Sequence, residues 1–142
     1  PMLPDPAHMD IIDEACISAF EAEDAVGVFS LCENIMDDPK LPMHCPYHHY
    51  LIPAVLLTVA GKISGETAEM LQKRLKTARE RAGTVPGGCC GQFGCCGAAV
   101  GAGIFACVWQ GSTPLSKTGW AAGNEMTARC LSAIASVEAP LL

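Results

Sequence analysis

Apolar residues recur at intervals of three and four positions along almost the whole chain. This spacing places them on one face of an α-helix, whereas no segment alternates with the period of two that a half-buried strand shows. The pattern therefore predicts an all-α fold, a compact bundle of five or six helices. The clearest helix has Ser64 as its N-cap and Gly83 just past its end, and its buried face consists of Ala68, Leu71, Leu75, Ala78 and Ala82.

Three further stripes predict helices elsewhere in the chain. A first helix over about residues 8–20 turns Ile12, Cys16 and Ala19 inward. A second, over about residues 23–36, has an inward stripe made of Ala25, Val28, Phe29, Cys32, Ile35 and Met36. A last helix over about residues 116–137 has an inward stripe made of Trp120, Thr127, Cys130, Leu131 and Ile134.

Two helices have unusual compositions. The third helix is expected to begin at Pro46 and to run to about Ala60, with Pro53 inside it. Because proline lacks an amide hydrogen, this helix should kink and leave the carbonyl of His49 unpaired. The helix from Cys96 to Trp109 is rich in glycine and alanine, which weakens a helix but permits close packing. We therefore expect it to lie at the centre of the bundle.

Size and charge narrow the classes of function. A chain of 142 residues, half of them hydrophobic and 17% charged, suits one folded domain over residues 1–142 and excludes extensive disorder. The formal charge of −6 makes nucleic acid and anionic membrane surfaces poor partners. The longest apolar runs, 51–60 and 98–109, are too short to cross a bilayer, and no signal peptide is visible. A cytoplasmic location is the expectation.

Nine cysteines set the chemistry apart from that of an ordinary helical domain. Their number is odd and their spacing uneven, which does not suit a secreted disulfide framework. Adjacent cysteines, such as Cys89 and Cys90, cannot reach normal disulfide geometry without strain. The expectation is reduced thiols in a reducing compartment, available for metal or redox chemistry.

The first candidate cluster is a histidine connector, residues 44–49, with the sequence HCPYHH. Neutral imidazole is a common ligand of divalent transition metals, and His44 and His48 are separated by four positions. They share a helical face only if the helix already runs through Pro46; otherwise the connector orients them. The alternative is that one histidine is a cap or core residue and the others are exposed, because no HExxH or CxxC motif accompanies them.

The second cluster is a cysteine loop, residues 89–96, in which Cys89, Cys90, Cys95 and Cys96 are interleaved with glycines. It precedes the start of the small-residue helix, where the dipole and free amides favour the thiolate form of Cys95 and Cys96. Such loops hold zinc or iron–sulfur clusters, although the usual CxxC spacing is missing. The remaining cysteines suit simple packing as small hydrophobes: Cys16, Cys32, Cys107 and Cys130.

The stretches 42–57, 79–82, 85–88 and 90–105 together resemble an uncharacterised Cys/His-rich domain of anaerobic bacteria and archaea. That domain occurs alone or C-terminal to methyltransferase-like domains. The resemblance implies that the recurrent polar residues are His44, His48, His49, Cys90 and Cys96, and it treats Cys45, Cys89 and Cys95 as additions. It transfers no activity, but it implies a methyltransferase-like protein as a possible partner.

These observations lead to a preferred hypothesis. The connector and the loop converge on one site that binds zinc, iron or an iron–sulfur cluster, with donor atoms roughly 3–4 Å apart. The expected metal ligands are His44, His48, Cys90 and Cys96. His49 would support a ligand or donate a proton, Gln92 would contact bound substrate, and Cys89 and Cys95 would lie against the cofactor.

Two other hypotheses stay open. A metal-free thiol redox or sulfur-transfer protein would use Cys96 and Cys90 as catalytic thiols, with a histidine such as His49 as the base. A non-catalytic interaction module would instead use the glycine-faced helix to pack as a homodimer. Metal analysis separates the first two hypotheses, and mutation of the clusters separates both from the third.

Overall fold

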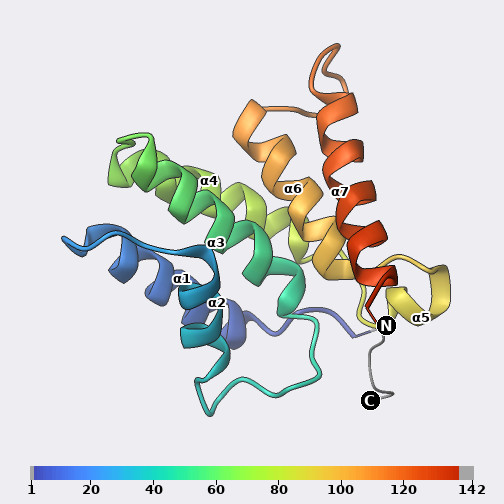
Figure 1. Ribbon diagram of the computed structural model, residues 1–142, viewed down its shortest axis with the longest axis horizontal. Coiled ribbons are helices and arrows are strands. Elements are labelled where there is room, and N and C mark those ends of the chain that lie inside the picture. The colour runs from blue at the N-terminus through green and yellow to red at the C-terminus, as the bar shows by residue number, and fades with distance from the viewer. Residues whose placement is uncertain (1, 138–142) are drawn as a thin grey trace.

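The protein folds as helices joined by short connections. The computed structural model describes residues 2–137, and within that range it contains seven α-helices and no strand (Figure 1). The helices are α1 (Pro6–Glu21), α2 (Val28–Met36), α3 (His48–Ile63), α4 (Ala68–Ala82), α5 (Cys89–Phe93), α6 (Gly97–Gln110) and α7 (Trp120–Ala135). The predicted all-α class is confirmed. In this part of the chain no helix has the length and apolarity needed to span a membrane.

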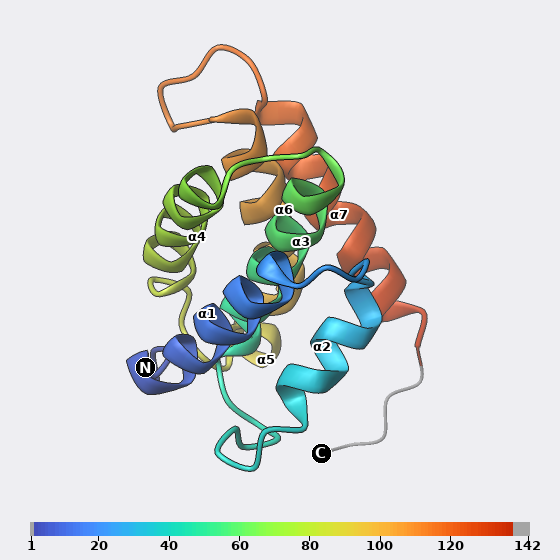
Figure 2. The ribbon, with the colours of Figure 1, turned by 90° about the vertical axis from the view of Figure 1, so that its left-hand side faces the viewer.

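Helix α3 is the centre of the bundle. It contacts α1, α2 and α4 on one side and α6 on the other, and α7 packs on the far side of α6 (Figures 1 and 2). Its side chains are therefore buried in nearly every direction, among them Tyr50, Leu51, Val55 and Leu57. A helix enclosed in this way is apolar all round, which explains why its sequence shows little amphipathic pattern.

Pro53 lies inside α3, and the helix continues through it. Because Pro53 has no amide hydrogen, the carbonyl of His49 cannot receive the helical hydrogen bond from that position. Gly101 of α6 lies against both groups: a Cβ atom there would be 2.7 Å from the His49 carbonyl oxygen and 2.9 Å from Pro53 Cδ. Helix α6 thus approaches the α3 backbone where α3 has lost a hydrogen bond. A kink at Pro53 stays a prediction.

A second glycine contact joins α6 to α7. A Cβ atom at Gly103 would lie 2.0 Å from Thr127 Oγ1, and one at Gly123 would lie 2.5 Å from Cys107 Sγ. As expected, the small-residue helix α6 lies inside the bundle, where it packs between α3 and α7. Its buried glycines face α3 and α7 of the same chain, so they offer no open surface to a second copy.

One detail of the predicted helices is wrong. The N-cap of α4 is Thr67, whose hydroxyl accepts a hydrogen bond from the Met70 amide, whereas Ser64 ends α3. The chain turns between these helices at Gly65, whose φ of 71° lies in the left-handed region that glycine adopts without strain. This turn takes up residues that the sequence pattern had assigned to α4.

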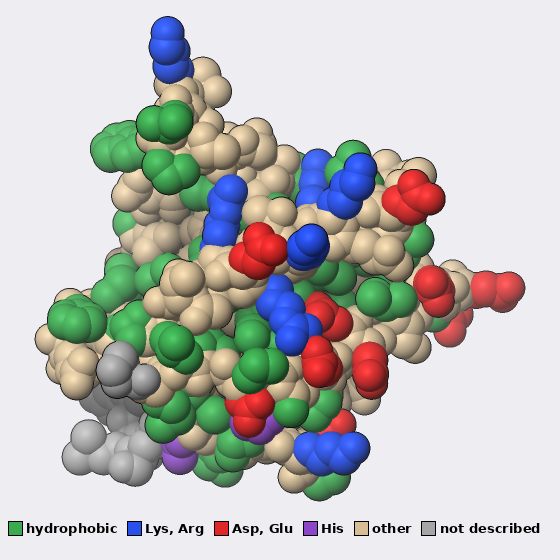
Figure 3. Space-filling model, turned by 180° about the vertical axis from the view of Figure 1, so that it is seen from behind, with side chains coloured by type: hydrophobic (Ala, Val, Ile, Leu, Met, Phe, Trp, Pro, Cys, Tyr) green, Lys and Arg blue, Asp and Glu red, His purple; other side chains and the backbone are tan. Residues whose placement is uncertain are grey.

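Several apolar residues predicted to point inward are exposed instead. Phe29 is 84% exposed, because α2 turns Leu31 and Ile35 toward the core. Trp120 is 75% exposed, because it is the first residue of α7, and Ile134 near the other end is also exposed. The α4 stripe agrees better with the prediction, since Leu71, Leu75, Ala78 and Ala82 are buried as expected. Exposed apolar, acidic and basic side chains lie next to one another on the rear surface (Figure 3).

A network of hydrogen bonds and salt bridges joins helices α1, α3 and α4. The buried Tyr50 hydroxyl of α3 donates to Asp13 of α1, and Arg79 of α4 forms salt bridges of 2.6 Å with Asp13 and 2.7 Å with Asp10. Burial, and then the negative charge of Asp13, raise the pKa of Tyr50, so its hydroxyl keeps its proton and stays a donor. The network joins α1, α3 and α4 with its polar groups satisfied.

The glycine contact between α3 and α6 leads to a first prediction. Gly101→Ala should destabilise the protein by about 1–3 kcal/mol, because the added methyl overlaps backbone and proline atoms that cannot move aside. Gly91→Ala is the matched control, since a Cβ atom at Gly91 meets nothing within 4 Å. Urea unfolding followed by circular dichroism measures both variants. Equal stability of the two would contradict the proposed close approach.

Candidate functional site

The histidine connector does not form a helical face. Helix α3 begins at His48 rather than at Pro46, after a turn in which the His49 amide donates to the Pro46 carbonyl. His44 therefore precedes the helix and is exposed, while His48 is half-buried. Histidine side chains reach the surface at the lower edge of the view in Figure 3. Because no helix runs through Pro46, His44 and His48 do not share a helical face, and the connector orients them separately.

His49 is the buried histidine of the connector, with 7% of its surface exposed. Its Nδ1 lies 3.0 Å from the Val85 carbonyl oxygen, which can only accept, so Nδ1 carries the proton. Burial lowers the pKa of His49, against the opposing effect of that hydrogen bond, and nearby His48 lowers it further. His49 is therefore neutral at pH 7, and its Nε2 has a free lone pair.

That free nitrogen points at the start of α6. A Cβ atom at Gly97 would lie 2.0 Å from His49 Nε2, and the three nearest atoms all belong to this imidazole. The ring thus occupies the space that a side chain at Gly97 would fill. Gly97 is the first residue of α6, and Cys96 is its N-cap. The structure therefore brings His49 from the connector to the residue next to Cys96.

The cysteine loop contains a short helix that the sequence pattern did not reveal. Helix α5 lies between Gly88 and Gly94, whose φ angles of 82° and 65° are both left-handed, and these glycines turn the chain sharply at each end. The Cys89 carbonyl accepts the amide of Cys95 at 3.5 Å, which folds the loop back on itself. A five-residue helix cannot be recognised from periodicity, since it completes little more than one turn.

The four loop thiols differ in exposure. Cys89 is 5% exposed, Cys90 is exposed, and Cys95 and Cys96 are half-buried. Burial raises the pKa of the Cys89 thiol, and Cys90, Cys95 and Cys96 raise it further as negative neighbours. Cys89 is therefore a loop thiol whose surroundings oppose its ionisation.

A thiol–imidazole contact lies at the connector. Cys45 Sγ is 3.7 Å from His8 Nδ1, and the His48 Nδ1 is 2.8 Å from the Cys45 carbonyl oxygen. Burial lowers the pKa of His48, and its ring stacks on Tyr47 with centroids 4.1 Å apart. Sequence analysis missed His8, which lies in α1 and belongs to no motif; only the packing of α1 against the connector brings it there.

The expected metal-binding set is not assembled in this conformation. Within residues 2–137, no group of three or more His, Cys, Asp or Glu side chains is arranged so that it could hold a metal ion. His48 binds the Cys45 carbonyl and His44 is exposed, while His49 is the histidine that contacts α6. Gln92, predicted to contact substrate, is exposed on α5.

The cysteines outside the two clusters fit simple packing. Cys16 is fully buried, and burial raises the pKa of its thiol to about 12. Burial also raises the pKa of Cys32, which is half-buried in α2. Cys107 and Cys130 are half-buried in α6 and α7. All nine cysteines are free thiols, as the sequence predicts.

The lowered pKa of His49 gives a second prediction. Between the ordinary pKa of 6.5 and the lower folded value, the unfolded chain binds the proton and the folded chain does not. Stability should therefore fall as the pH drops below about 6.5. His49→Asn keeps a donor for the Val85 carbonyl and removes the titration, so its stability should fall less. Urea unfolding at pH 7.5 and pH 5 measures this.

His44→Gln is the control for that experiment, because His44 is exposed and should not alter the pH dependence. A wild-type protein and a His49→Asn variant with the same pH dependence would show that His49 is protonated as readily in the folded chain as in the unfolded one.

Most of the chain matches the model of a protein family. A model described as a family of unknown function, DUF5714, matches residues 12–141, which include the connector, the loop and all the helices except the start of α1. No curated protein and no solved structure matches the chain.

Proposed function

The chain belongs to the DUF5714 family, whose function is unknown, and we propose that its cysteine loop carries out thiol redox or sulfur-transfer chemistry with His49 as the base. One observation carries this proposal: the unprotonated Nε2 of His49 lies against Gly97, next to Cys96. A neutral imidazole near a thiol can act as the base that activates a sulfur nucleophile, and here the imidazole lies at the residue next to Cys96.

The position of Cys96 supports it as the attacking thiol. As the N-cap of the 14-residue α6, it lies where unpaired amides and the helix dipole stabilise negative charge. Its side chain makes no capping hydrogen bond, so the sulfur is available. Cys89 is a poor attacking thiol, because burial and its neighbours raise its pKa. Cys90 is exposed and can serve as the second thiol.

The proposed reaction is reduction of a disulfide. His49 takes the proton of Cys96, and the thiolate attacks one sulfur of the substrate, breaking the S–S bond and forming a mixed disulfide. The leaving sulfur takes the proton from His49. The Cys90 sulfur then loses its proton and attacks Cys96, and the second substrate sulfur leaves, takes up that proton and departs as a thiol. The substrate gains two electrons, and the protein is left with a Cys90–Cys96 disulfide that an external dithiol must reduce.

A second candidate function is binding of zinc, iron or an iron–sulfur cluster. His48 and His49 each place Nδ1 beside a backbone carbonyl, which leaves Nε2 open as in metal-ligating histidines. His44, His48, Cys90 and Cys96 are the proposed ligands, with Cys89 and Cys95 as neighbouring thiols and Gln92 near a bound substrate. Assembly of this set requires the connector and the loop to move together. A methyltransferase-like protein or a second copy is the proposed partner.

Alkylation tests the redox proposal. With iodoacetamide near neutral pH, the loop thiols should react before Cys107 and well before the buried Cys16. His49→Asn removes the base and keeps a donor for the Val85 carbonyl, so it should slow labelling of Cys96 several-fold and leave Cys90 unchanged. Mass spectrometry of partially alkylated protein measures the rate at each cysteine.

Gly91→Ala is the control, since it adds a methyl within the loop where nothing lies within 4 Å. The dependence of the Cys96 rate on pH should also change in His49→Asn, which a purely structural role of His49 would not produce. Equal labelling of the loop and Cys107 in all three proteins would show that the cysteine loop serves packing.

Metal analysis tests the second candidate. Protein purified without oxygen should contain zinc or iron, with sulfide if a cluster is present, and the metal should protect the loop from alkylation until a chelator is added. Replacing Cys90 and Cys96 together by serine should abolish retention of the metal, whereas replacing Cys107 and Cys130 by serine should leave the metal bound. If the purified protein contains no metal and the chelator does not change the alkylation rates, the redox proposal is the better account.

A further inference from the structure

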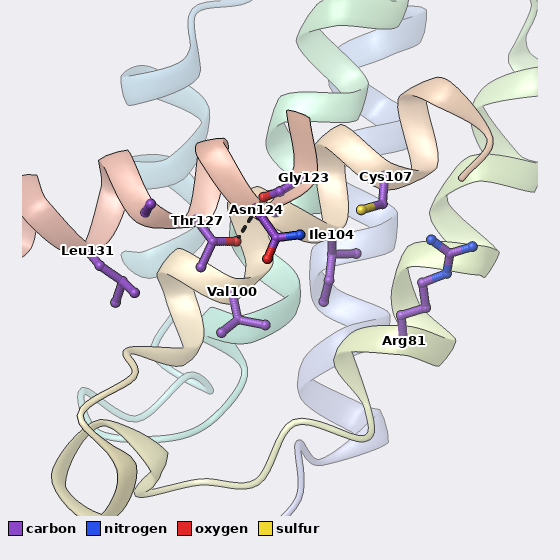
Figure 4. A pocket seen from close by; sticks show the side chains of 10 residues that line it. Arg81, Val100, Ile104, Cys107, Gly123, Asn124, Thr127 and Leu131 are labelled. Carbon is purple, nitrogen blue, oxygen red and sulfur yellow. Dashed lines mark hydrogen bonds between the residues drawn. The ribbon is translucent and has the colours of Figure 1, made fainter. Parts of the chain in front are cut away.

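A pocket separate from the thiol site lies where α4, α6 and α7 meet. Its volume is about 480 Å³, within the range of about 300–1,000 Å³ that small-molecule sites occupy. Its walls are mostly apolar and include Val100, Ile104, Ala128 and Leu131. Arg81 of α4 lies at one end and Leu131 at the other, with Val100 and Ile104 between them (Figure 4).

Arg81 is the cation of this pocket, and it lacks an acidic partner. Arg74, Arg79 and Arg129 form salt bridges with carboxylates, but within residues 2–137 no carboxylate does so with Arg81. Its side chain donates from Nη2 to the Ser112 carbonyl oxygen at 3.0 Å, and among residues 2–137 its other side-chain donors have no partner. An unpaired guanidinium is notable in a chain of charge −6.

The two polar side chains of α7 that line the pocket each donate a hydrogen bond to a backbone carbonyl of α7. The Thr127 hydroxyl donates to the Gly123 carbonyl, drawn as the dashed line in Figure 4, and Asn124 Nδ2 donates to the Trp120 carbonyl. The strongest free polar anchor is therefore Arg81. An adjoining hollow of about 160 Å³, lined by Lys73, Arg74 and Arg81, adds positive charge at the same end.

We propose that this pocket binds a small amphipathic carboxylate, with its acid group on Arg81 and its apolar chain along Val100 and Ile104 toward Leu131. The arginine fork matches a carboxylate geometrically, and one unpaired cation is balanced by one negative charge. The apolar walls favour a hydrocarbon body without further polar groups. This proposal is independent of the thiol chemistry, because no loop cysteine lines the pocket.

Calorimetric titration with four probes tests the roles of the ligand's charge and of its chain length. Octanoate should bind, octanamide should bind at least ten-fold more weakly, and octylamine should not bind at pH 7.5. Hexanoate should bind more weakly than octanoate, because it buries fewer methylenes. Equal affinity for the acid and the amide, or no binding of any straight-chain acid of six to ten carbons at millimolar concentration, would overturn the proposal.

Matched variants locate the site. Arg81→Gln should weaken octanoate binding at least ten-fold and leave the affinity for octanamide unchanged. Lys76→Gln, on the exposed face of α4, should change neither affinity. Ala128→Phe should block all the probes, because Ala128 lines the pocket from an exposed position on α7. Ala121→Phe, exposed on α7 outside the pocket, should leave binding intact. Unchanged octanoate affinity in folded Arg81→Gln would overturn the assignment.

Discussion

The close crossing of α3 and α6 is the contact on which the rest of the structure depends. It requires two glycines four residues apart, Gly97 and Gly101, because the His49 ring and the His49 carbonyl occupy the space of their side chains. Pro53 creates part of this requirement, since it removes the donor that would otherwise hold that carbonyl within α3. Helix α7 packs mainly on α6, so the position of α6 also fixes α7. The small residues at this crossing lower the helix propensity of α6, but they allow its backbone to contact α3 closely.

The same crossing builds the candidate site. A histidine on the buried helix α3 is forced to be neutral, and a carbonyl from the chain after α4 fixes which nitrogen is free. The crossing sets that nitrogen against the first residue of α6, so the packing that stabilises the domain also positions the base. Exposure then separates the loop thiols, because Cys89 is shielded and kept protonated while Cys90 faces solvent. Thiol chemistry needs such differences between chemically identical groups.

Helix α6 also links the thiol site to the pocket. Val100 donates its amide to the Cys96 carbonyl in the first turn of the helix, and its side chain lines the pocket. The Gly103 and Gly123 contacts hold α7 against α6 along one side, and Arg81 of α4 closes the polar end. A short helix with small residues can thus contact three neighbours and carry two sites, because its narrow cross-section leaves room for both. A bulkier helix would fill this space with its own side chains.

The sequence by itself determined the features that depend on near neighbours. Helical spacing fixed the all-α class and the buried stripe of α4, and small-residue composition placed α6 at the centre with Cys96 at its start. Only the tertiary structure decided which histidine meets the loop: the sequence favoured His44 and His48, but His49 contacts Gly97 and Val85. It also brought His8 to Cys45 and left Trp120 exposed. Periodicity defines an apolar stripe within one helix. The rotation of each helix about its axis follows only from packing all the helices together. The same is true of the contact that orients His49, because its partner Val85 lies 36 residues away.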